Sequence, residues 1–244
     1  MKFPSIDLHI HSSFSDGKNS IKQIVGRALE VNLDFIAITD HITDSWKARI
    51  SKLKNQDIIK EYLEEISNCQ ESLKRNNSKL TIFKGIEIDL GSSEIFIKKM
   101  VQPIKYDLIL FEYLESVEGL AFLQNLINFW KVKYPSVDHF PIFGLAHFDP
   151  AYFIYGYLDT LIQFLEKNTI YFEFNYRYPE YYSRQNIEFF KRLRDSIIPV
   201  AIGSDSHSIS NLSNTEEPLE MIKYYNLEDN LTDLLKKISR IRQT

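Results

Sequence analysis

The sequence predicts an α/β protein built on a seven-stranded parallel barrel, and three observations support this. Apolar runs alternate with amphipathic helical segments along all 244 residues, a length that suits one large α/β domain. No linker rich in Gly, Pro or Ser divides the chain, so we expect a single domain over residues 1–244. Residues of metal-binding type follow the apolar runs, and barrel sites gather at the carboxyl ends of strands. An open, doubly wound sheet is the alternative.

Seven segments have the composition of strands, being rich in β-branched and aliphatic residues. Several are nearly continuous apolar runs, as expected for parallel strands that are buried on both faces. The predicted strands are Ile6–His9, Phe35–Thr39, Leu80–Ile88, Leu108–Phe111, Ile142–Ala146, Ile170–Phe174 and Ile198–Gly203.

Helical patterns lie between these strands. The first is preceded by Ser20 and Gln23 at the spacing of a capping box, which sets its start. The last pattern is amphipathic and is expected to cover one end of the barrel. The predicted helices are Ile21–Val31, Asp57–Arg75, Ala121–Lys131, Leu158–Lys167, Gln185–Arg194 and Asn230–Arg240.

Composition narrows the range of partners and compartments. The net charge of −4 gives no basic surface for a duplex, so nucleic acid is an unlikely partner. No apolar run approaches the roughly 20 residues that cross a bilayer, so no membrane partner is expected. One cysteine cannot form an intramolecular disulfide, which suits a reducing, cytoplasmic location. The oligomeric state is left open.

Five of the six histidines occur in four short motifs that follow predicted strands. Imidazole and carboxylate are ligands of zinc, manganese and iron, so this clustering predicts a polynuclear metal site. The sixth, His139, precedes the fifth strand and is expected to be structural or exposed. The five are His9 and His11 in DLHIH, His41 in ITDH, His147 in GLAHFDP and His207 in GSDSH.

Acidic residues accompany these histidines. Asp205 and His207 are two residues apart, as are His9 and His11, and so share one face of a strand. Either Asp40 or His41 can bind an ion while the other holds its geometry, and we take His41 as the ligand and Asp40 as the catalytic candidate.

Two further acids have different settings. Glu87 lies among apolar residues at the end of the third strand, where an acid needs a cation or another partner. Asp16 lies in an Asp-Gly turn, so turn chemistry alone is the competing explanation for it.

The motifs DLHIHSSFSDG, ITDH, GIE, GLAH and GSDSH together resemble those of the polymerase and histidinol phosphatase (PHP) family of metal-dependent phosphoesterases. Each motif is weak alone, but five in the family's order, from residue 7 to residue 207, are specific. The resemblance implies a distorted (β/α)7 barrel of the TIM-like, PHP type. It also implies a cluster of two or three divalent ions, which could be Zn, Mn or Fe.

The resemblance also implies ligand sets. The first ion would take His9, His11, Glu87 and Asp205. The second would share Glu87 and add His147. The third would take Asp16, His41 and His207, with Asp16 in place of a histidine that some members have.

One position departs from the family pattern. Members commonly carry a histidine just after the fourth strand, where this chain has Leu114. Glu112 lies two residues earlier, in an otherwise apolar strand, and our hypothesis is that it substitutes as a metal ligand. The alternative is an exposed glutamate at a strand end.

The sixth strand continues into a loop that could bind phosphate. Glu173 and Asn175 resemble the Glu-x-Asn of histidinol-phosphatase-like members, in which the following loop brings cationic side chains toward phosphate. We take Arg177 and Arg184 as candidates, because guanidinium binds phosphoryl oxygens through two hydrogen bonds.

These features predict a hydrolase that cleaves a small phosphate ester with metal-activated water. Histidinol phosphate is the substrate that the resemblance suggests. Two alternatives stay open: an exonuclease that acts on short oligonucleotides, and a non-catalytic metal-binding regulatory module.

Overall fold

The computed structural model describes residues 3–45, 50–102, 104–133, 140–153, 157–182 and 184–241. All strand pairings in this part of the chain are parallel, in the order β1-β2-β4-β5-β6-β7-β8, with the short β3 paired to β4. The strands are β1 (Ile6–Ile10), β2 (Phe35–Ile38), β3 (His41–Ile42), β4 (Thr81–Asp89), β5 (Leu108–Glu112), β6 (Ile142–Leu145), β7 (Tyr171–Asn175) and β8 (Val200–Gly203).

The first and last strands nearly close the sheet into a barrel. Just beyond β8, Ser206 bridges β1: its amide donates to the His9 carbonyl at 3.3 Å, and its carbonyl accepts from the His11 amide at 2.9 Å. The predicted barrel is therefore confirmed over the open sheet. All seven predicted strands are present, and β3 is an additional two-residue strand after a break at Thr39 and Asp40.

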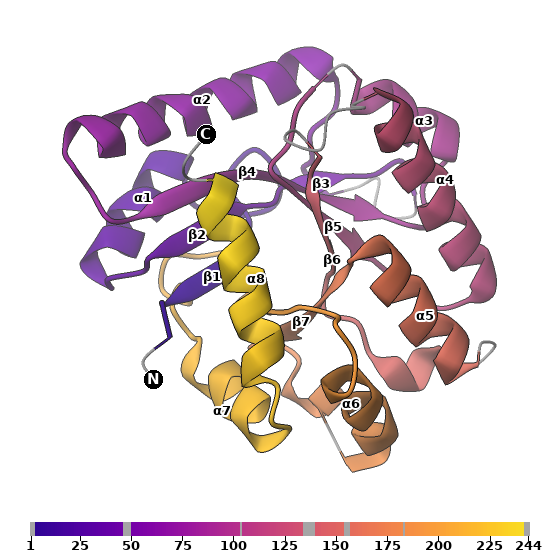
Figure 1. The fold of residues 1–244 in the computed structure, drawn as a ribbon. Helices are drawn as coiled ribbons and strands as arrows, with labels where there is room; N and C mark the ends of the chain where they lie inside the picture. Colours follow the sequence, from indigo (N-terminus) through magenta and orange to yellow (C-terminus); the bar gives the residue numbers. More distant parts are fainter. Residues whose placement is uncertain are drawn as a thin grey trace.

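Helices surround the strands (Figure 1). The predicted helices are all present, and α1 has the capping box of Ser20 and Gln23. Two further helices were missed, α3 and α7; both are short, at seven and nine residues. The α-helices are α1 (Ile21–Glu30), α2 (Gln56–Arg75), α3 (Glu94–Met100), α4 (Val117–Lys133), α5 (Leu158–Asn168), α6 (Ile187–Arg194), α7 (Glu216–Tyr224) and α8 (Glu228–Ile241).

The last helix was predicted to cover one end of the barrel, and α8 lies at the amino ends of the strands. The buried Asn230 amide of α8 donates to the carbonyls of Leu193, Ser196 and Ile198, in the segment that enters β8. At its other end, Ile241 lines a cavity at the start of β4. In Figure 1 the helix crosses in front of the strands. The carboxyl ends of the strands are thus left for the site.

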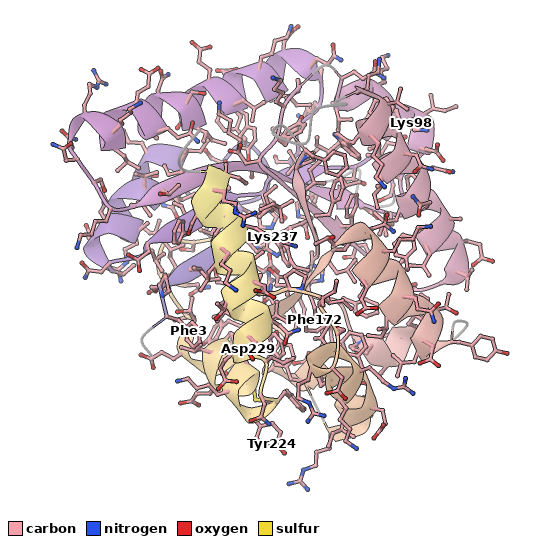
Figure 2. The ribbon with its side chains drawn as sticks, in the orientation of Figure 1. Phe3, Lys98, Phe172, Tyr224, Asp229 and Lys237 are labelled. Carbon is pink, nitrogen blue, oxygen red and sulfur yellow. The ribbon has the colours of Figure 1, made fainter. Side chains whose placement is uncertain are left out.

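Aromatic packing fills the side of the barrel between β7 and α6. The ring of Phe172, labelled in Figure 2, lies 5.1–5.6 Å from the rings of Phe174, Phe189 and Phe190. All four side chains are buried, which contributes hydrophobic stabilisation where β7 delivers its polar residues. In the described part of the chain, no helix has the length and hydrophobicity to cross a membrane.

The hydroxyl of Tyr62 links α2 to the sheet at the point where the pairing between β2 and β4 ends and that between β3 and β4 has yet to begin. This fully buried group lies 2.8 Å from both the Ile38 carbonyl of β2 and the Gly85 carbonyl of β4. These strands lead to His41 and Glu87, so the contact fixes the spacing of two candidate ligands.

Replacing Tyr62 with phenylalanine should lower the free energy of unfolding by about 1–3 kcal/mol, because two buried carbonyls lose the single hydroxyl donor that they share. Urea denaturation of the metal-free protein measures this change. Tyr224→Phe serves as the matched control, because Tyr224 is 60% exposed and should give little change. Equal stabilities for the two variants would contradict the stabilising role of the Tyr62 hydroxyl.

Candidate metal centre

The carboxyl ends of the strands bring together all nine predicted ligands. His9 on β1 and His11 just after it lie close together, and the segment after β8, which bridges to β1 at Ser206, adds Asp205 and His207 beside them. His147 and Asp205 both have positive φ angles, 31° and 49°, a conformation uncommon outside glycine and typical of functional sites. The barrel therefore gathers residues from positions 9 to 207 in one place.

The first group is His9, His11 and Asp205, all buried, with ligand atoms within 4.8 Å of one another. The two Nε2 atoms of the histidines are 3.0 Å apart, and His11 Nε2 lies 3.1 Å from Asp205 Oδ1. Separations near 3 Å are those of donors that share one ion at bonds of about 2.0–2.2 Å.

The second group is His11, Asp16, His41 and His207, of which Asp16 and His207 are partly exposed. Asp16 Oδ1 lies 3.2 Å from His207 Nε2, and Asp16 Oδ2 lies 3.7 Å from His41 Nε2. Asp16 thus does more than form the turn, because its carboxylate faces three imidazoles.

Glu87 lies at the centre of the cluster. Its two carboxylate oxygens are 2.9–3.4 Å from nitrogens of His9, His11, His41 and His147. The side chain is fully buried, and within the described residues neither oxygen accepts a well-aligned hydrogen bond. A buried carboxylate with this geometry fits a bridging metal ligand.

Glu112 also lies in the cluster and is fully buried, so the alternative of an exposed strand end is wrong. Its oxygens are 3.5 Å from His41 Nδ1 and 3.9 Å from His147 Nε2. With His41 and Glu87 it forms the third group of donors. Leu114, at the position of the family histidine, is buried among apolar residues.

Charge compensation within the cluster shifts the pKa of its members. Burial lowers the pKa of His41, but the charges of Glu87 and Glu112 outweigh this and raise it to about 10. Burial also raises the pKa of Glu87, but the imidazoles of His9 and His41 hold it well below its usual range. Without bound ions, the contact between His41 and Glu87 therefore favours an imidazolium paired with a carboxylate.

Glu173 on β7 orients His9 and His147, a role that was not predicted from the sequence. Its carboxylate accepts from His9 Nδ1 at 2.9 Å and from the His147 amide at 2.7 Å. Asn175 donates to it at 3.0 Å. Such contacts fix the ring orientation of metal-binding histidines. The signal was present in the Glu-x-Asn alternation on β7.

Asp40 faces the loop between β1 and α1. Its carboxylate accepts from the Ser12 amide at 2.8 Å and from the hydroxyls of Ser12 and Ser15. In the described residues its hydrogen bonds therefore shape the loop that carries Asp16, a positioning task. A catalytic role for Asp40 gains no support from these contacts.

The two arginines predicted to bind phosphate differ in their contacts with the cluster. Arg177 Nη1 donates to Asp205 Oδ2 at 3.0 Å and lies 3.2 Å from His207 Nδ1, at the edge of the cluster. Arg184 is exposed, and among the described residues it makes no hydrogen bond or ion pair with the cluster. His139 lies outside the described residues.

A family model described as the PHP domain matches residues 7–241, almost the whole chain. The chain belongs to the PHP domain family. The resemblance seen in the five motifs is thereby confirmed. No curated protein matched the sequence.

Several solved structures share this PHP fold at low sequence identity. Histidinol phosphate phosphatase from Lactococcus lactis, complexed with zinc, L-histidinol and phosphate, has a TM-score of 0.61 at 17% identity, covering 92% of this chain and 94% of its own. A putative histidinol phosphatase from Listeria monocytogenes gives 0.57 at 16%, covering 86% and 97%. A chain of an archaeal ribonuclease P with mature tRNA gives 0.50 at 15%, covering 92% and 89%.

Gly203→Ala should weaken zinc binding by the PHP domain by about 10–100-fold, the effect of losing a contact that orients a ligand. A Cβ at Gly203 would lie 1.9 Å from Glu173 Oε1 and so displace the carboxylate from His9. Competition with a chromogenic chelator measures the affinity. Gly26→Ala is the control, because a Cβ there meets no atom within 4 Å. Native affinity in Gly203→Ala would contradict this role.

Metal binding should release protons, because His41, with its pKa near 10, carries one at neutral pH in the metal-free protein. Affinity should therefore rise as the pH increases from 6 to 8. Calorimetric titration in two buffers of different ionisation heat measures the protons released. Heats that do not depend on the buffer would show that His41 keeps its proton and binds no ion.

Proposed function

We propose that the chain hydrolyses a small phosphate monoester with a water activated by two or three divalent ions. Membership of the PHP family supports a metal-dependent hydrolase of phosphate esters. The observation that carries the proposal is the convergence of five imidazoles and four carboxylates on one end of the barrel, with Arg177 beside them. A side chain that serves as nucleophile is not required by this chemistry.

The residues of the cluster would hold the ions and the water. His9, His11 and Asp205 would hold one ion, Glu87 would bridge, and the outer group with Asp16 and His207 would hold another. When bound, such ions supply a water that loses its proton near neutral pH and offset phosphoryl charge. Glu173 keeps the His9 ring in place, so the donors stay aligned during the reaction.

Arg177 would orient the phosphoryl group. Its contacts with Asp205 and His207 use only Nη1, while its side chain is half exposed and offers further N–H donors to a ligand. Guanidinium donors aimed at the phosphoryl oxygens stabilise the charge that develops in the transition state.

A cavity of about 240 Å³ beside His147 would receive the alcohol part of the ester. Tyr113, Tyr152 and Tyr181 line it, together with the acids Glu115 and Asp149. Its size favours a small substrate, and its acidic and aromatic walls disfavour an oligonucleotide backbone. Histidinol phosphate is our candidate, supported by the likeness to the Lactococcus enzyme bound to histidinol and phosphate.

Arg177→Ala should lower kcat/KM for p-nitrophenyl phosphate by about 10²-fold, as expected for the loss of a transition-state donor. Arg184→Ala should leave kcat/KM unchanged, because among the described residues this exposed side chain makes no hydrogen bond or ion pair with the cluster. Steady-state kinetics at saturating Mn²⁺ compares the two. The reverse ranking would show that Arg184 binds the phosphate.

A substrate panel tests the proposed function itself. The protein, loaded with Mn²⁺ or Zn²⁺, is given p-nitrophenyl phosphate, histidinol phosphate and a short 5′-phosphorylated oligonucleotide. Phosphate release from the small esters alone supports the proposal. Release of mononucleotides would instead establish a nuclease, and inactivity with every metal would favour a regulatory module.

A further inference from the structure

The three donor groups of the cluster differ in their chemistry. The outer group of His11, Asp16, His41 and His207 has three imidazoles and one carboxylate. The group of His9, His11 and Asp205 has two imidazoles and one carboxylate. The group of His41, Glu87 and Glu112, which we name the carboxylate-rich group, reverses this ratio. The share of carboxylate donors, which prefer hard cations, is therefore higher near β4 and β5 than near β1.

The fold builds the carboxylate-rich group from adjacent strands. Glu87 on β4 pairs in register with Leu110 on β5, so Glu112 lies two residues further toward the carboxyl end on the same face. Both carboxylates are fully buried. Within this group two buried carboxylates face the imidazole of His41, and a divalent ion would add the positive charge that favours their burial.

We infer that Glu112 makes the carboxylate-rich group favour Mn²⁺. The preference of this group for Mn²⁺ over Zn²⁺ would exceed that of the two imidazole-rich groups. Carboxylate oxygens suit manganese, whereas imidazole suits zinc and the later transition metals. The chain would therefore hold a mixed-metal centre when both ions are supplied. This inference rests on the metal centre of the proposed function but not on the hydrolytic step.

The separations support an ion at this position. His41 Nδ1 is 2.9 Å from Glu87 Oε2 and 3.5 Å from Glu112 Oε1. On the opposite side His147 Nε2 is 3.4 Å from Glu87 Oε1 and 3.9 Å from Glu112 Oε2. Two carboxylates thus lie between two imidazoles, and an ion held by His41, Glu87 and Glu112 would have two carboxylate donors and one imidazole donor.

Metal competition on the whole chain tests the inference without any assay of activity. Metal-free protein is equilibrated with mixtures of Mn²⁺ and Zn²⁺, free Mn²⁺ is measured by electron paramagnetic resonance, and both metals are counted by elemental analysis. The native chain should keep about one Mn²⁺ at zinc levels that fill the imidazole-rich groups. Glu112→His, which replaces the carboxylate with an imidazole, should shift the competition toward zinc by at least about tenfold.

Two further variants keep the test decisive. Glu112→Gln keeps the size and one oxygen but loses the charge, so it should bind Mn²⁺ more weakly; circular dichroism checks the fold of each variant. Glu118→His makes the same exchange at an exposed position of α4 and should behave like the native chain. Native competition in folded Glu112→His, or native Mn²⁺ affinity in Glu112→Gln, would overturn the inference.

Failure of the inference is separable from failure of the proposed function. A normal shift in the competition without phosphatase activity would leave the inference standing and remove the hydrolytic role. Phosphatase activity with no shift would do the opposite. A chain that bound neither metal would contradict both.

Discussion

Buried charge is the constraint on which this structure depends. Glu87, Glu112 and Asp205 are withdrawn from water within a barrel whose walls are apolar, and burial of an ionised carboxylate is costly unless a cation accompanies it. Imidazoles supply that charge in the metal-free chain, and divalent ions would supply it when they displace the protons. The same side chains therefore determine both the stability of the barrel mouth and its chemistry.

The rest of the fold holds these side chains in place. Glu173 reaches His9 only because Gly203 leaves room on the neighbouring strand, and Asp40 fixes the loop that presents Asp16. Positive φ angles at Tyr113, His147 and Asp205 place local backbone strain beside the site. The opposite end carries no comparable group among the described residues; there Asn230 ties α8 to the strands.

The barrel strands and the metal cluster could be predicted from the sequence, because buried parallel strands are apolar runs and the ligand motifs directly follow them. Apolar runs located all seven barrel strands, and the His and Asp motifs after them located the cluster. The structure was needed to show which residues that are far apart in the sequence contact one another. Sequence could not show that His41 faces two donor groups through its two nitrogens, or that Arg177 and not Arg184 contacts the cluster. Helices α3 and α7, of seven and nine residues, were not predicted, although the eight-residue α6 was.

The most direct test of the account is anomalous diffraction from crystals grown with zinc and manganese, with data collected at both absorption edges. We expect at least two ions, one of them within about 2.0–2.2 Å of a Glu87 oxygen and all of them coordinated by the predicted histidines and acids. An anomalous map without a peak at this end of the barrel, in crystals of folded protein with ample metal, would contradict it.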